Sequence, residues 1–149
     1  MKEKRFIAYR SVGLPKYFIH DDKSNVPLYV IKEKASKIDI YNAEQELIFE
    51  IDHNKIRYLV RKNGSEFAKV YPKKIFSPFF KIEYGTQLLS CRQNLLKNKY
   101  LVIDSSGSTV VEFIKKVRSI KGRWDILIHD INYTELTIAL SSIIFFHKF

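Results

Sequence analysis

The end of the chain, ELTIALSSIIFFHKF at Glu135–Phe149, has no polar side when it is arranged as a helix. Asn132 followed three residues later by Glu135 fits a capping box, in which each side chain satisfies a free backbone N–H group. A helix is therefore expected to begin there. With about 100° between successive residues, Leu136 and Ile138 fall on nearly opposite sides. A helix that is apolar all round lies either in a protein core or in a membrane.

The length of this segment favours a protein core. A membrane span needs about 20 consecutive apolar residues, and the stretch from Asn132 to Phe149 is shorter than that. Polar residues also interrupt it, namely Glu135, Ser141, Ser142, His147 and Lys148. We therefore expect a helix that is buried in protein, and no transmembrane span.

The chain from Pro27 to Asp130 reads as short alternating apolar and polar runs, with turn residues about every 8 to 12 positions. The expected strands are Pro27–Lys34, Lys37–Tyr41, Glu46–Asp52, Ile56–Arg61, Glu66–Tyr71 and Arg123–Ile131. Two more hairpins are expected at Phe79–Arg92, around Gly85, and at Lys99–Val117, around Ser105–Ser108. With N-terminal strands near Phe6–Tyr9 and Tyr17–Ile19, the total is about twelve.

The strands and the helix together predict one architecture. A closed barrel of about twelve strands has a wider lumen than the eight-stranded barrel that side chains alone can fill. A helix about 10 Å across would fill it. We predict a mainly β fold: a closed antiparallel β-barrel of about twelve strands around a buried hydrophobic C-terminal α-helix. With 46% apolar and 28% charged residues, the composition fits one folded domain over residues 1–149.

The sequence resembles the tubby C-terminal-like superfamily, in particular its LURP-one-related branch, which also includes the phospholipid scramblases. The similarity covers residues 27–146 and is carried by KIRYLVRKNGSEFAKVYPKKIFSPFFKI, KYLVIDSSGSTVVEFIKKV and WDILIHDINYTELTIALSSIIFF. The last stretch looks like that family's final strand, acidic turn and central helix. The resemblance implies a closed barrel around a hydrophobic helix, in agreement with the reading of the residues.

The family suggests a ligand class but no site. Tubby proteins bind phosphoinositides through basic residues on the barrel surface, so the resemblance implies anionic lipid headgroups as partners. Those basic positions are not matched here residue by residue. Scramblases carry a cysteine-rich palmitoylation segment and an acidic calcium-binding segment, whereas this chain has Cys91 alone and no comparable acidic run. Scrambling is therefore not implied.

Basic residues provide the candidate binding site. The net charge of +10 favours anionic partners. The densest basic run, KKVRSIKGR, contains Lys115, Lys116, Arg118, Lys121 and Arg123, and a second group contains Lys69, Lys73 and Lys74. Near an anionic bilayer each such charge contributes about 1 kcal/mol. The alternative for both groups is an ordinary solvated loop, in which lysines discourage aggregation between strand edges.

No catalytic, metal or cofactor motif is visible. The histidines are isolated, no second cysteine can complete a zinc site, and no phosphate-cradling glycine loop or GxSxG turn occurs. We expect a non-enzymatic binding module without a cofactor. One cysteine excludes an intrachain disulfide, and no signal sequence is seen, so we expect a cytoplasmic protein, peripheral at the inner face of the membrane.

Two kinds of function remain open at this point. The first is docking at an anionic phospholipid surface through a basic face. The alternative is a nucleic-acid-binding or protein-interaction module, because a barrel can also present aromatic rings on which bases stack. No RNP-like or helix-turn-helix motif accompanies the charge, so nucleic acid is the less favoured partner. A further protein partner remains compatible with the sequence.

Overall fold

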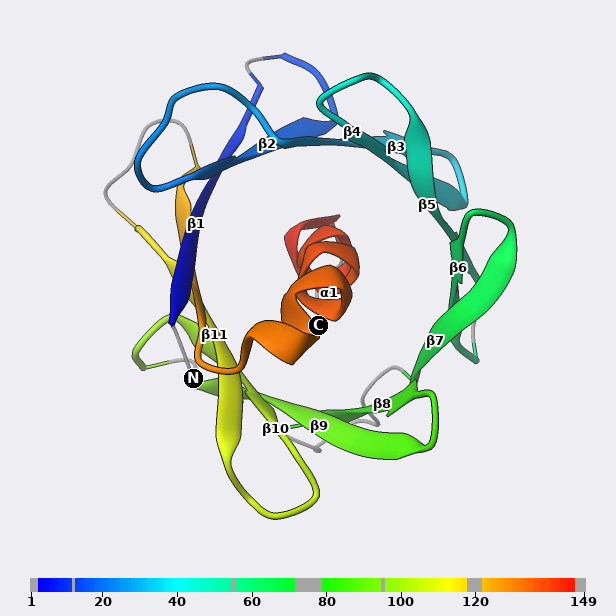
Figure 1. Cartoon of the computed structure of the whole chain (residues 1–149), viewed down its shortest axis with the longest axis vertical. Helices are drawn as coiled ribbons and strands as arrows, with labels where there is room; N and C mark the ends of the chain where they lie inside the picture. The colour runs from blue at the N-terminus through cyan, green and yellow to red at the C-terminus, as the bar shows by residue number, and fades with distance from the viewer. Residues whose placement is uncertain are drawn as a thin grey trace.

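The computed structural model describes residues 3–11, 13–54, 56–71, 79–94, 96–117 and 122–146. Across these residues the chain forms twelve antiparallel strands, closed into a barrel, and one α-helix inside it (Figure 1). This architecture confirms the predicted fold class. The strands are β1 (Lys4–Arg10), β2 (Lys16–Asp21), β3 (Tyr29–Lys34), β4 (Lys37–Asn42), β5 (Leu47–His53), β6 (Tyr58–Lys62), β7 (Ser65–Tyr71), β8 (Phe79–Tyr84), β9 (Gln87–Asn94), β10 (Lys99–Ile103), β11 (Thr109–Lys115) and β12 (Trp124–Ile128). A short 3-10 turn, η1 (Ile131–Tyr133), leads into the helix α1 (Thr134–Phe146).

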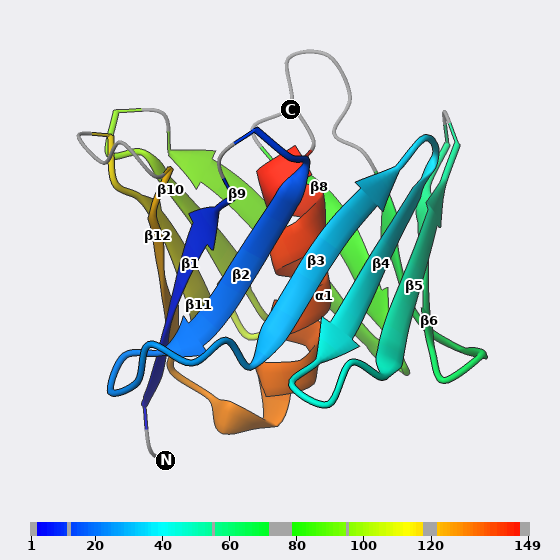
Figure 2. The same ribbon diagram turned by 90° about the horizontal axis from the view of Figure 1, so that it is seen from above.

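The barrel closes in the simplest possible order. Each strand pairs with the strands next to it in the sequence, and β12 returns to pair with β1. In this closing pair Phe6 lies opposite Ile126 and Ala8 opposite Trp124. Because every strand reverses direction, successive connections alternate between the two ends of the barrel. Figure 2 shows η1 and the start of α1 at one end and the last turn of α1 at the other.

The hairpin between β6 and β7 turns at Asn63 and Gly64. Asn63 and Gly64 have φ angles of 49° and 85°. Two successive positive φ angles are what a tight primed turn requires, and asparagine and glycine tolerate them best. The twist of this turn matches that of the two strands it joins.

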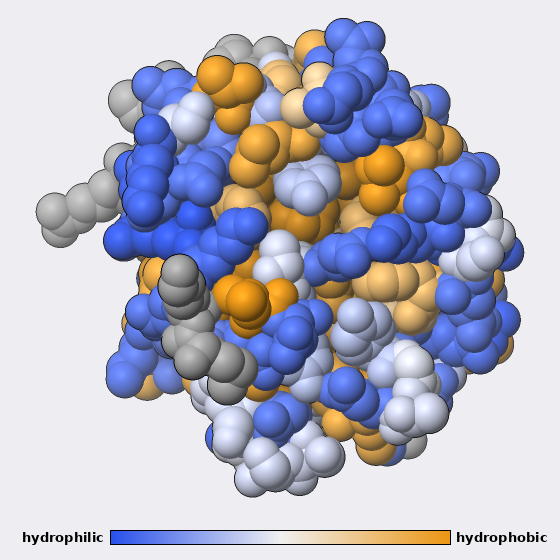
Figure 3. Space-filling model, in the orientation of Figure 1, coloured by the Kyte–Doolittle hydropathy of each residue, from blue (hydrophilic) through white to orange (hydrophobic). Residues whose placement is uncertain are grey.

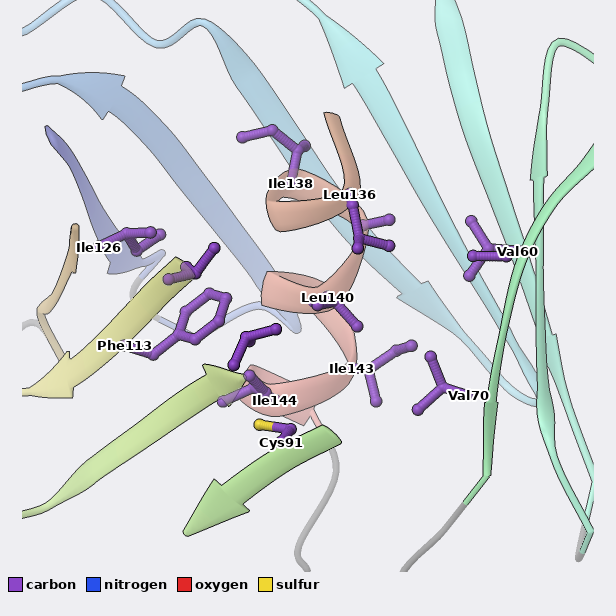
Figure 4. Packing of buried hydrophobic residues seen from close by; sticks show 14 of the residues in the cluster. Val60, Val70, Cys91, Phe113, Ile126, Leu136, Ile138, Leu140, Ile143 and Ile144 are labelled. Atoms are coloured by element: carbon purple, nitrogen blue, oxygen red, sulfur yellow. The ribbon is translucent and has the colours of Figure 1, made fainter. Parts of the chain in front are cut away.

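The inner wall of the barrel is apolar all the way round. Side chains alternate across a strand, so every second residue points into the lumen. Each strand contributes a residue with no exposed surface: Ala8, Ile19, Ile31, Ile40, Ile51, Val60, Val70, Ile82, Cys91, Val102, Phe113 and Ile126. These side chains form a continuous lining, and α1 lies against it (Figure 4).

The helix is buried on every side, as its sequence predicts. All residues from Leu136 to Ile144 are buried, including residues on opposite sides such as Leu136 and Ile138. In Figure 4, Ile143 points toward Val70, while Ile144 lies near Cys91 on another part of the wall. Within the described residues, no helix combines the length and the hydropathy needed to cross a bilayer.

Three hydroxyl groups on the buried helix are satisfied by the helix itself. Thr137 Oγ1 donates to the carbonyl of Tyr133 at 2.6 Å, and Ser141 Oγ donates to the carbonyl of Thr137 at 2.7 Å. Ser142 Oγ donates to the carbonyl of Ala139 at 2.7 Å. Bonding to a carbonyl three or four residues earlier lets a hydroxyl enter an apolar core without a partner on the wall. The helix therefore needs no polar residue facing it from the strands.

The start of the helix differs from the predicted capping box. Asn132 lies inside η1, and the N-cap of this 3-10 turn is Asp130, whose carboxylate accepts the backbone N–H of Asn132 at 3.0 Å. Glu135 instead pairs with Lys62 on the wall. Asp130 has an extended backbone at the point where the chain leaves β12, so its carboxylate is the first acceptor available to the turn.

Aromatic rings close the barrel around both ends of α1. Near the end of the helix, Phe145 packs against Tyr17 and Trp124, with ring centroids 4.7 Å and 5.2 Å apart. Near its start, Tyr133 packs against Tyr84 at 6.2 Å. The lumen is therefore a packed core. A ligand or partner can bind only at the two ends of the barrel or on its outer wall.

A chain that ends at Thr134 should lose its cooperative thermal transition, because it lacks the helix that fills the lumen. Burial of each Leu, Ile or Phe side chain contributes about 1.5 to 3 kcal/mol, and domains of this size are stable by only about 5 to 15 kcal/mol in total. Differential scanning calorimetry measures the transition. A sharp transition in the shortened chain would show that α1 is not the core.

Ile143→Asp should prevent folding, because it places an unpaired carboxylate among apolar side chains where Ile143 has no exposed surface. Ile143→Val is the matched control and should cost about 0.5 to 1.5 kcal/mol. Urea denaturation followed by circular dichroism distinguishes the two. Similar midpoints for both variants would mean that water reaches this face of α1.

Candidate functional site at a basic barrel rim

The structure describes four of the predicted basic residues and separates them into two places. Lys115, Lys116 and Arg123 lie together where β11 connects to β12, whereas Lys69 lies on the outer wall in β7. Strands β8, β9 and β10 stand between β7 and β11, so the structure does not bring the two groups together. Arg118, Lys121, Lys73 and Lys74 lie outside the described residues.

Three of the predicted basic residues form ion pairs: Lys69 pairs with Glu66 on the wall, and Arg123 and Lys116 both pair with Asp125. Arg123 Nε lies 2.9 Å from Asp125 Oδ1, and Lys116 Nζ lies 3.5 Å from Asp125 Oδ2. Arg5 reaches the same carboxylate from β1, with Nη2 at 2.6 Å from Oδ2. The Asp125 side chain is only 2% exposed. Three cationic groups around one carboxylate leave an excess of positive charge at the surface.

The ion cluster holds Asp125 in its charged form. Burial acts to raise the pKa of this carboxyl, but hydrogen bonds from Arg123 and Arg5 and the charge of Lys116 outweigh it, and the pKa falls below its ordinary value. Asp125 is therefore ionised at neutral pH. The cluster links β12 to β1 and to the end of β11, at the seam where the barrel closes.

Many basic residues lie at the end of the barrel where α1 ends, including residues that the sequence analysis did not single out. We define the basic rim as the connections at this end together with the strand residue on each side. Its described basic residues are Arg10, Lys16, Lys34, Lys37, Arg57, Lys97, Lys99, Lys115, Lys116 and Arg123. Among the described residues, this rim contains no aspartate or glutamate.

The opposite end has the opposite charge. We define the acidic rim in the same way, at the end where η1 and α1 begin. Its acidic residues are Glu3, Asp21, Asp22, Glu44, Glu46, Asp104 and Asp130, and its basic residues in the described chain are Lys4, Lys23 and Lys62. Figure 3 views this end and shows hydrophilic residues around a hydrophobic centre.

The direction of α1 matches this distribution of charge. The first turn of a helix carries a partial positive charge and the last turn a partial negative charge, because the peptide dipoles align along the axis. α1 begins at the acidic rim and ends at the basic rim (Figure 2). The helix and the two rims therefore stabilise each other electrostatically.

Several cations of the basic rim pair with acids on the outer wall. Lys34 Nζ lies 3.2 Å from Asp39 Oδ2, and Lys37 Nζ lies 3.1 Å from Glu50 Oε2. Lys115 forms no ion pair with a described residue, and its Nζ lies 5.9 Å from the ring centroid of Trp124. Some cations of the basic rim are therefore held in ion pairs with the wall, and others are available to a ligand.

Other features of the described surface offer no comparable site. A hollow of about 350 Å³ near Glu3, Arg5, Asp21 and Lys23 has charges of both signs and favours neither anions nor cations. No group of three His, Cys, Asp or Glu residues within the described ranges could hold a metal ion. Burial raises the pKa of the Cys91 thiol far above its ordinary value, so it is not a nucleophile at neutral pH.

Asp125→Asn should destabilise the fold by about 1 to 3 kcal/mol, because it removes charged hydrogen bonds from a buried acceptor. The lowered pKa means that this stability is present above the unfolded pKa of about 3.9 and is lost as the pH falls through the folded pKa. The difference from the natural protein should therefore shrink in acid. Urea denaturation at several pH values measures it.

Asp52→Asn is the matched control, since Asp52 pairs with Arg61 in an exposed position. Exposed pairs contribute about 0 to 1 kcal/mol. Equal and small losses for both variants would show that the Asp125 cluster does not hold the seam.

Comparisons with known proteins bear on the fold. Neither a protein-family model nor a curated protein sequence matches the chain. Among solved structures, the chain is similar to the X-ray structure of the Arabidopsis thaliana protein AT5G01750, with a TM-score of 0.72 and 14% sequence identity. The similarity covers 95% of this chain and 88% of that one. At this level of identity the match shows a shared fold.

Proposed function

We propose that this protein is a non-enzymatic module that docks on anionic phospholipid membranes through its basic rim. We further propose that it belongs to the LURP-one-related branch of the tubby-like proteins, on the basis of the sequence resemblance and the fold of its structural neighbour. In this proposal it is a peripheral protein at the inner face of the membrane, where anionic lipids are concentrated.

The segregation of charge between the two rims carries this proposal. Basic residues come from every described connection at one end of the barrel, so they encircle it. A ring of positive charge at one end matches a flat anionic surface, and the acidic rim at the other end is repelled by the same surface. With about 1 kcal/mol from each charge near the bilayer, several unpaired cations are enough for weak, salt-sensitive binding.

The cations that support docking are not quite those expected from the sequence. Lys116 and Arg123 are engaged by Asp125, so they contribute less than their number suggests. Arg57, Lys97 and Lys115 lie on three different connections of the basic rim and form no ion pair with a described residue. We assign them the larger share of the attraction.

The aromatic side chains make nucleic acid the weaker alternative. Single-stranded nucleic acid is held by rings on which its bases stack. Every phenylalanine, tyrosine and tryptophan whose side chain the structure describes is at least partly buried. Charge alone would remain for a nucleic acid, without the stacking that gives such complexes their affinity.

Neutralising Arg57, Lys97 and Lys115 together, each to Gln, should reduce binding to vesicles of phosphatidylcholine and phosphatidylserine. Loss of three charges near the surface should lower the partition coefficient by about tenfold to a hundredfold. Cosedimentation at about 50 mM salt measures the bound fraction, and pure phosphatidylcholine vesicles should bind neither form.

Lys4, Lys23 and Lys62, each changed to Gln, form the matched control, because they remove the same charge from the acidic rim. This variant should bind almost as well as the natural protein. Equal losses in both variants would mean that net charge, and not the basic rim, drives binding. Tighter binding to an oligonucleotide at the same salt would favour the nucleic-acid alternative.

A further inference from the structure

Exposed aliphatic side chains lie on the connections of the basic rim. Leu14, Ile56, Leu96 and Val117 are 55%, 73%, 97% and 67% exposed, and each belongs to a different connection. Single exposed aliphatic residues are ordinary on a protein surface. Here the same feature, one exposed aliphatic side chain, occurs on four separate connections at one end of the barrel. These connections lie at the end of the barrel where α1 ends (Figure 2).

Each of these apolar residues is close in the sequence to a cation of the same rim. Ile56 precedes Arg57, Leu96 precedes Lys97, and Val117 follows Lys116. Leu14 is separated from Lys16 only by Pro15. A protein that lies at a bilayer interface needs this combination, since apolar groups enter the acyl boundary while cations meet the lipid phosphates.

Local hydrogen bonds hold two of these loops in shape. The Asn54 side chain accepts the backbone N–H groups of Ile56 and Arg57 at 2.8 Å and 3.0 Å. The Asn94 side chain accepts the backbone N–H of Lys97 at 3.2 Å. These bonds hold the described backbone beside Ile56 and Leu96.

The acidic rim also exposes aliphatic residues, but in a different setting. Val26, Leu47 and Ile131 are exposed there, and Leu88 is exposed next to this rim, at the second residue of β9. Leu47 follows Glu46, and Ile131 follows Asp130, so acids flank these two side chains. An anionic bilayer would repel the carboxylates before the apolar groups reached it. Of the two rims, as far as their residues are described, the basic rim is the one that combines exposed aliphatic residues with the charge that such a surface attracts.

We infer that the protein docks end-on, with the barrel axis along the membrane normal and with Leu14, Ile56, Leu96 and Val117 inserted at the boundary between headgroups and acyl chains. This inference rests on the proposed function and adds the orientation and the depth of binding. The occupant of the rim is the anionic bilayer as a surface, and not a free headgroup, because only a bilayer offers acyl chains to the apolar residues.

A single thiol label tests the orientation. Cys91 is fully buried and its thiol is largely protonated, so a thiol reagent should modify a cysteine introduced on the surface in preference to it. Leu96→Cys places an environment-sensitive fluorophore on the basic rim, and Leu88→Cys places the same fluorophore near the acidic rim. Both positions are exposed, so both variants should keep the thermal transition of the natural protein.

With phosphatidylcholine and phosphatidylserine vesicles, the label at position 96 should shift to shorter wavelength and brighten several-fold, while the label at position 88 should not change. Soluble glycerophosphoserine should change neither. Equal responses at both positions, or a response at position 88 alone, would overturn the end-on orientation. Sedimentation without any spectral response would overturn insertion and leave the charge-driven docking intact, whereas no sedimentation at all would overturn both.

Apolar substitutions provide an independent check. Ile56→Ser with Leu96→Ser should lower partitioning by about tenfold and make the remaining binding more sensitive to salt. Val26→Ser with Leu88→Ser is the matched control and should leave partitioning unchanged. If the Ile56→Ser, Leu96→Ser variant partitions like the natural protein, while the variant that neutralises Arg57, Lys97 and Lys115 loses binding, the protein docks without insertion.

Discussion

The contact between α1 and the lining of the barrel is the interaction on which the rest of the structure depends. Every strand presents a fully buried side chain to the lumen, and the helix meets that lining on all its sides. Side chains of the wall alone do not fill a barrel of twelve strands, and here the helix occupies the remaining space. The helix must therefore lack a polar stripe, and its hydroxyl groups must bond within the helix.

Filling the lumen leaves the two ends and the outer wall as the surfaces for recognition. The up-and-down order of the strands sends alternate connections to opposite ends, which lets the two rims differ in charge. The basic rim is the sum of several short connections, each with one or two cations. No single loop would attract an anionic surface strongly, but their common orientation makes the contributions add.

Short-range patterns were enough to predict the fold, and they failed where the structure depends on distant residues. Alternation located the strands, and the missing polar stripe placed the helix in the lumen. Arg5 and Asp125 are separated by 120 positions, so nothing near either residue indicates their pairing. The basic rim was partly visible in Lys115 and Arg123, but its other members become neighbours only when alternate connections are placed at one end. Lys69 was predicted as a site residue from its neighbours in the sequence, but it lies on the outer wall in β7, away from the basic rim.

The order of elements along the chain has a consequence for synthesis. All twelve strands precede α1, and β1 must wait for β12 before the sheet can close. The ribosome therefore releases a long apolar lining before it releases the helix that covers it. Consecutive strands can pair as they are made, but the closing pair of β1 with β12 joins distant segments and is therefore slow to form. Nascent chains of this protein should depend on chaperones that shield strand edges until α1 has been synthesised.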